Sequence, residues 1–163
     1  MSVNREMPYV YVLPEDDANR QMAIGFIREP SVATRKIQIL NEAGGWYHVL
    51  ELFKDVYIQE MERYPKGFVV LLIDFDESPS RLETAKAVIP EHLKDRVFVI
   101  GVWSEPEKLR SNCGKTYEKI GLALAKDCCD NTNEIWAHDL LQHNTSELAR
   151  LRELVFPFLF SAS

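Results

Sequence analysis

An unbroken run of six apolar residues, FVVLLI at positions 68–73, limits the folds open to this chain more than any other feature of the sequence. The run has the length of a strand, and a strand with one face in water would alternate apolar and polar residues. Residues 68–73 are therefore predicted to form a strand that is covered on both faces. Such strands are typical of parallel sheets with helices packed on each side.

Three further segments have the length and the β-branched or aromatic composition of buried strands. They are residues 8–13 (PYVYVL), 35–40 (RKIQIL) and 96–103 (RVFVIGVW). Turn residues, NEAGG, end the second of them. The chain is therefore expected to contain four strands.

Helical patterns fill the intervals between these strands. The clearest is a stripe of apolar residues spaced three and four apart, as the buried face of a helix requires. Asp16 or Asp17 is expected to cap an earlier helix, and Ser78 and Pro79 are expected to begin a later one that Pro90 closes. The members of the stripe are Trp46, Val49, Leu50, Phe53, Val56, Tyr57, Met61 and Tyr64.

The sequence after the fourth strand is also predicted to be helical. A short helix is expected over residues 134–141, and Asn144 with Glu147 has the spacing of a capping box for a last helix over residues 145–160. An apolar stripe predicts a longer helix before these, with the members Tyr117, Ile120, Gly121, Leu124, Ala125 and Cys128. The chain ends in apolar side chains that are expected either to close the core or to join two copies in a homodimer, namely Phe156, Phe158, Leu159 and Phe160.

Strands that alternate with helices predict the α/β class. The expected architecture is a three-layer sandwich, with a mainly parallel four-stranded sheet flanked by helices and a helical C-terminal extension. With 163 residues and 46% hydrophobic content, the chain is interpreted as one domain over residues 1–163. Its core is expected to span about residues 8–110 and its helical part about 111–163.

Composition narrows the class of protein. No run reaches the roughly 18 apolar residues of a membrane span, and the start MSVNREMPYV lacks the apolar core of a secretion signal. Three cysteines, two of them adjacent, describe no disulfide framework, so reduced thiols and a cytoplasmic location are expected. The net charge of -6, from 25 acidic and 19 basic residues, argues against broad attraction to phosphate backbones.

Acidic residues stand where the predicted strands end. Glu15 follows the first strand, and Asp74 and Asp76 follow the third. Ligands gather beyond the carboxyl ends of parallel strands, and strand alternation would turn Asp74 and Asp76 to the same face. Close carboxylates repel each other unless a cation or a proton lies between them, which favours a metal site with Mg²⁺ or Mn²⁺ as the predicted cofactor. The alternative is that these acids are solvated loop residues and helix caps.

The order of these segments resembles the Toprim domain, the metal-binding catalytic module of topoisomerases, bacterial primases and several nucleases. The similarity lies in VLPEDDANRQ, QILNEAGGWYHVLELF and VVLLIDFDE, and it covers roughly residues 9–109. The resemblance implies that Glu15 is the catalytic acid–base residue and that Gly44 or Gly45 forms the glycine turn. It also implies that Asp74 and Asp76 bind magnesium.

Two positions depart from the family pattern. Asp16 follows Glu15 where the family usually has glycine, and Asn19 stands where many members carry an acid. Some nuclease members add an acidic residue after the fourth strand, and Glu105 or Glu107 corresponds to it here. The candidate site therefore comprises Glu15, Asp74 and Asp76, with Asp16, Gly45 and Glu107 as additional candidates.

Two functions remain open. If the site is catalytic, the resemblance implies metal-dependent hydrolysis or transfer of phosphodiester bonds in DNA or RNA. A nuclease-like role is then favoured, because nothing in the sequence resembles the separate tyrosine-bearing domain of topoisomerases. If the site is not catalytic, the chain is a Toprim-like interaction or assembly module, which its acidic composition and the lack of an evident basic groove favour.

Overall fold

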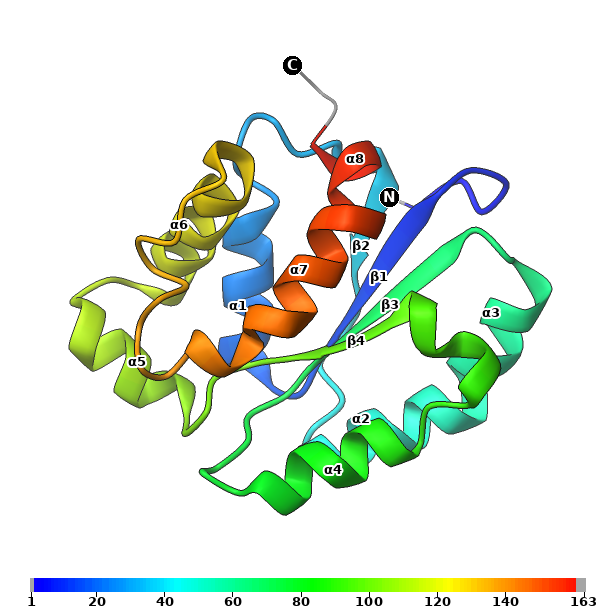
Figure 1. Ribbon diagram of the computed structural model, residues 1–163, viewed down its shortest axis with the longest axis horizontal. Helices are drawn as coiled ribbons and strands as arrows, with labels where there is room; N and C mark the ends of the chain where they lie inside the picture. Colours follow the sequence, from blue (N-terminus) through cyan, green and yellow to red (C-terminus); the bar gives the residue numbers. More distant parts are fainter. Residues whose placement is uncertain (1, 161–163) are drawn as a thin grey trace.

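The structure, a computed structural model, describes residues 2–160 and confirms the α/β class (Figure 1). Within these residues four parallel strands form one sheet in the order β2-β1-β3-β4. Each strand falls inside its predicted segment or extends one residue beyond it. The strands are β1 (Tyr9–Pro14), β2 (Ile37–Ile39), β3 (Gly67–Leu72) and β4 (Val97–Ile100).

One face of the sheet is covered by α2 (Trp46–Leu52), α3 (Ile58–Arg63) and α4 (Pro79–Ala87) (Figure 1). The sequence predicts one continuous helical stripe over α2 and α3, but a π-helical turn at Phe53–Tyr57 separates the two helices. A π turn holds an extra residue and so rotates the side chains that follow. Val56, which lies inside this turn, is 44% exposed instead of buried in the stripe.

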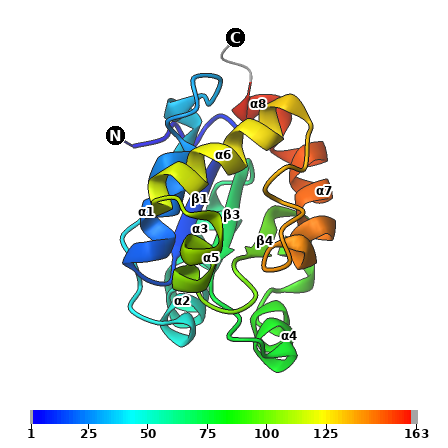
Figure 2. The ribbon, with the colours of Figure 1, turned by 90° about the vertical axis from the view of Figure 1, so that its left-hand side faces the viewer.

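The opposite face carries the remaining helices, which are α1 (Asp17–Phe26), α5 (Pro106–Cys113), α6 (Tyr117–Asp130), α7 (Thr145–Leu154) and α8 (Phe156–Leu159) (Figures 1 and 2). α1 and α6 lie side by side at very short range. A Cβ at Gly25 would lie 1.9 Å from the carbonyl oxygen of Glu118, and one at Gly121 would lie 1.8 Å from that of Met22. Only glycine allows the two backbones to approach so closely.

Two side chains attach α7 and the turn before it to the edge strand β4. Glu147 Oε2 accepts the N–H of Val99 at 2.8 Å, and Asn144 bonds both the N–H and the C=O of Gly101, at 3.2 and 3.0 Å. The predicted capping box is therefore wrong, because Asn144 makes no capping bond to α7 and is directed at the sheet instead. Both side chains occupy backbone groups that an edge strand would otherwise leave unpaired.

The short helix predicted over residues 134–141 is also wrong, because this segment forms turns. The N–H of Leu140 bonds the ring nitrogen Nδ1 of His138, and the carbonyl oxygen of Leu140 accepts the N–H of Trp103. Neither backbone group is thus available for a helical ladder.

The last predicted helix is interrupted at Val155, which separates α7 from α8. Pro157 lacks the N–H that would continue the helical ladder. Phe156 and Leu159 of α8 are buried in the core, at 8% and 2% exposure. Across residues 2–160, no helix is both long enough and apolar enough to cross a membrane.

Candidate metal centre

The candidate site lies where β1 and β3 end side by side. Pro14 and Leu72 are the last paired residues of the two strands, and the N–H of Glu15 bonds the carbonyl oxygen of Leu72 at 2.9 Å. Beyond this point β1 leads into α1 and β3 leads into α4, so Glu15 and Asp74 emerge at one edge of the sheet. This is the carboxyl edge, where ligands of parallel sheets gather.

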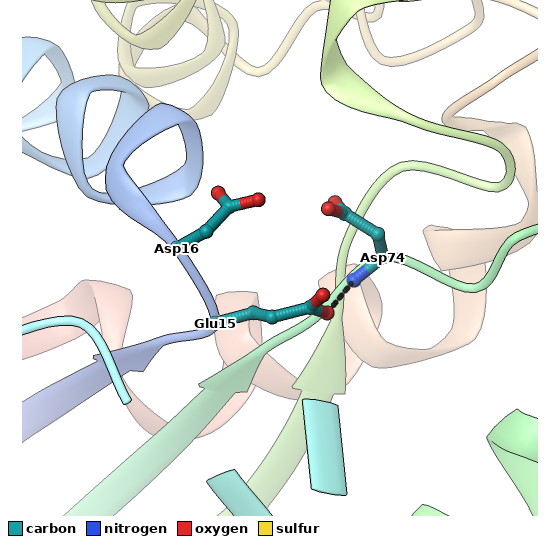
Figure 3. Close-up of side chains that lie close together, drawn as sticks. All are labelled: Glu15, Asp16 and Asp74. Carbon is teal, nitrogen blue, oxygen red and sulfur yellow. Dashed lines mark hydrogen bonds between the residues drawn. The ribbon is translucent and has the colours of Figure 1, made fainter. Parts of the chain in front are cut away.

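Three carboxylates meet at this edge, those of Glu15, Asp16 and Asp74 (Figure 3). One oxygen from each lies within 4.8 Å of the others. Asp16 reaches the group as the N-cap of α1, and Figure 3 shows its carboxylate turned toward that of Asp74. In the part of the chain that the structure describes, no other group of three His, Cys, Asp or Glu side chains has this geometry.

Glu15 is held by both its backbone and its side chain. Its carbonyl oxygen accepts the N–H groups of Gly44 and Gly45 at 2.8 and 3.2 Å. These glycines have φ of 90° and 144°, values that other residues rarely adopt, so the glycine turn lies against Glu15. Oε1 of Glu15 accepts the backbone N–H of Asp74 at 2.8 Å. Burial raises the pKa of Glu15, although this hydrogen bond opposes the effect.

Asp74 is the most buried acid of the group, with 7% of its surface exposed. Its Oδ1 accepts a hydrogen bond from Nδ2 of the fully buried Asn19 at 2.9 Å. Burial raises the pKa of Asp74 to about 8, with the charges of Glu15 and Asp16 acting in the same direction and the Asn19 bond acting against it. At neutral pH the carboxyl group is therefore largely protonated unless a cation neutralises its charge.

Two predicted acids lie outside the close group. β3 has ended before Asp76, whose φ is 50°, so strand alternation no longer directs its side chain. That side chain is 75% exposed and lies 3.8 Å from the guanidinium of Arg81. Glu107 is exposed on α5, and its charge reaches Asp74 only as a small contribution to the raised pKa. The structure thus brings Asp16, and not Asp76, into the group.

Sequence reasoning did not assign roles to two residues that complete the site. Asn19 links Asp16 to Asp74, because its Oδ1 accepts the N–H of Asp16 at 3.2 Å while its amide nitrogen bonds Asp74. Arg81 donates to the carbonyl oxygen of Asp74 at 2.8 Å, and its guanidinium lies 4.8 Å from the ring centroid of Trp46. The spacing of Asp16 and Asn19 is that of a capping box and was a usable signal for Asn19. No sequence signal connects Arg81 with Asp74.

The donor set suits a hard divalent cation. Carboxylate oxygens are the ligands that Mg²⁺ and Mn²⁺ prefer. Oxygens on opposite sides of a Mg²⁺ ion lie about 4.2 Å apart, given ligand distances of about 2.1 Å. Only one pair of the three oxygens can lie on opposite sides of the ion, and neighbouring ligands lie about 3.0 Å apart, so side chains at the 4.8 Å limit would need to close by up to about 1.8 Å to share one ion.

Comparisons with known proteins do not assign a family or a function to this protein. The fold is an α/β fold with a parallel sheet, and the acidic group at its carboxyl edge could hold a divalent ion. No family model matches the sequence, and no curated protein and no solved structure matches it significantly.

Proposed function

We propose that this protein is a Toprim-like enzyme that uses Mg²⁺ or Mn²⁺ to hydrolyse or transfer phosphodiester bonds in nucleic acid. The observation that carries the proposal is the convergence of Glu15, Asp16 and Asp74 at the carboxyl edge of β1 and β3. The contact between the glycine turn and Glu15 supports it, because the resemblance in sequence expects both features at this edge. The proposal keeps two of the three acids expected from the sequence and adds Asp16.

Each residue of the group has a chemical role in this proposal. Asp16 and Asp74 would hold the metal ion, which supplies positive charge to a phosphate oxygen when bound. Glu15 would transfer a proton to or from the attacking or leaving oxygen, and burial raises its pKa above the usual value of a glutamate, which is the direction that favours this role. Arg81, beside Asp74, is a cation that can bond a phosphate oxygen.

A non-enzymatic interaction module is the second candidate. It is favoured by the side chain of Asp76, which is exposed and paired with Arg81 instead of facing the group. The net charge of -6 favours it as well, because binding to phosphate backbones relies on clustered basic residues. In this case a metal ion would stabilise the fold without any cleavage of phosphodiester bonds.

Thermal melting during titration with Mg²⁺ or Mn²⁺, starting from protein in EDTA, tests the metal site. The metal is expected to raise the melting temperature of the wild type but not that of Asp74→Asn. Asp95→Asn is the matched control, because Asp95 is exposed just before β4, at the opposite edge of the sheet. Equal stabilisation of all three proteins, or of none, would refute the metal site.

Cleavage assays on single- and double-stranded DNA and RNA then separate the two functions. Metal-dependent cleavage by the wild type that is lost in Glu15→Gln supports the enzyme. Stabilisation by metal without cleavage of any of the four substrates supports the interaction module.

A further inference from the structure

A cavity of about 110 Å³ lies between the sheet and the helices α1, α6, α7 and α8. Its walls include Val12, Val70 and Leu72 from the sheet, and Met22 and Leu151 from the helices. All the lining side chains are apolar or weakly polar, and the cavity contains no charged group. It is separate from the acidic group and takes no part in the proposed reaction.

The burial pattern of β3, a central strand, agrees with this gap. On the side of α2 and α4, Val69 and Leu71 are 1% and 0% exposed. On the cavity side, Val70 and Leu72 are only partly buried, although they lie in the middle of the sheet and beneath a layer of helices. Protein interiors leave few voids larger than a water molecule, so this space is not ordinary packing.

Contacts on either side of the cavity explain why the helices do not close it. The close approach of Gly25 and Gly121 holds α1 against α6. Asn144 and Glu147 hold the start of α7 against the edge strand β4. α1 and α7 lie on opposite sides of β3 (Figure 2). A shift of α1 alone toward β3 would break its close contact with α6, and a shift of α7 would break the bonds of Asn144 and Glu147.

We propose that this cavity is a binding site for a small, uncharged, apolar molecule about the size of one aromatic ring. Water would find almost no hydrogen-bond partners on such walls. An engineered cavity of about 150 Å³ with similar walls, in another protein, stays dry and binds benzene or xenon. A charged ligand would lose its hydration without compensation, and a long acyl chain exceeds the available volume.

Benzene is the probe for this site. At about ten times its Kd, benzene is expected to raise the melting temperature of the wild type by roughly 3–6 °C. It should also shift the methyl NMR signals of Val12, Val70 and Leu72, and leave those of Val69 and Leu71 on the opposite face unchanged. Val70→Phe is expected to fill the cavity and abolish both effects. Val69→Ile is the matched control, because it enlarges the neighbouring residue on the packed face and should retain both effects.

Val70→Ile provides a milder variant if Val70→Phe does not fold, and it should weaken benzene binding several-fold. The proposal is overturned if benzene leaves the wild-type melting temperature and the cavity methyl signals unchanged. It is equally overturned if folded Val70→Phe, or Val70→Ile in its place, binds benzene as tightly as the wild type.

Discussion

Oε1 of Glu15 accepts the backbone N–H of Asp74 at 2.8 Å, although the two residues are 59 positions apart in the chain. The bond ties the side chain of one acid to the backbone of the other, directly beyond the last paired residues of β1 and β3. It keeps the two carboxyl groups close together in the folded protein. Glu15 therefore stabilises the site in addition to the catalytic role proposed for it.

Substitutions of Glu15 separate these two roles. Glu15→Gln retains an oxygen that can accept the N–H of Asp74, so its free energy of unfolding should stay within about 1 kcal/mol of the wild type. Glu15→Ala leaves that N–H unpaired and should cost about 1–3 kcal/mol. Urea denaturation measures both values. Metal-dependent cleavage should be lost in both variants. If Glu15→Gln destabilises the protein as much as Glu15→Ala does, the hydrogen bond to Asp74 is not the stabilising contact.

Without metal, the free energy of unfolding is expected to fall as pH rises from about 4 to 8. The pKa of Asp74 is about 8 in the folded protein and about 3.9 in an unfolded chain. Between these values the folded state holds a proton that the unfolded state has lost. The stability linked to this proton is complete below about pH 4 and is lost as pH rises to 8, at up to about 1.4 kcal/mol per pH unit. Urea denaturation in EDTA from pH 5 to pH 8 measures this slope.

Two comparisons assign that slope to Asp74. Asp74→Asn cannot ionise at this position, so its stability should depend less on pH than that of the wild type. Saturating Mg²⁺ should flatten the wild-type slope, because a bound cation favours the ionised carboxylate. The same slope in both proteins would show that Asp74 is not the titrating group. Glu15, whose pKa is also raised, would contribute in the same direction.

Asn19→Asp places a fourth acid against the group. In EDTA the variant should be less stable than the wild type, because a carboxylate replaces the amide that donates to Asp74. A metal ion should stabilise it more than it stabilises the wild type, since a further oxygen ligand is then available. Asn19→Ala is the matched comparison and should lose about 1–3 kcal/mol without any gain in response to metal. Melting with and without Mg²⁺ measures each effect.

Asn144→Ala tests the attachment of the α7 region to the sheet. The variant leaves the N–H and the C=O of Gly101 without their partner, which should cost roughly 2–4 kcal/mol of unfolding free energy. Gln142→Ala is the control, because this neighbouring side chain is exposed, and its effect should stay within about 0.5 kcal/mol. The response to metal should survive in both variants. If Asn144→Ala no longer responds to metal, the attachment of the α7 region to β4 influences metal binding at the acidic group.

The elements that were predicted correctly are those with local causes. The apolar run over residues 68–73 supplies most of β3 (Gly67–Leu72), because a short apolar run between turn residues is enough to specify a buried strand. Ser78 and Pro79 begin α4 because a cap and a first-turn proline act within a few residues. The spacing of Asn144 and Glu147 suits a capping box, and so the prediction was wrong. Their partners are Gly101, just after β4, and Val99 of β4, which lie 43 and 48 positions earlier in the chain.

The candidate site was also predicted only in part. Because Glu15 and Asp74 follow neighbouring strands, the sequence predicted that they would meet, and the shared carboxyl edge of the parallel strands brings them together. Asp16 takes the place expected for Asp76 because the backbone of Asp76 is left-handed and because Asp16 is the N-cap of α1. The alternation of side chains along a strand predicts neither of these two features.

The sequence by itself determined the alternation of strands and helices, the position of each strand and the edge at which acidic residues gather. These follow from hydrophobic runs, caps and turns, whose physics is local. Only the tertiary structure decided which carboxylates converge, how deeply Asp74 is buried and where the helices leave a cavity. Each of these depends on contacts between segments far apart in the chain, such as Asn19 with Asp74 and Gly25 with α6, and no local pattern specifies such distances.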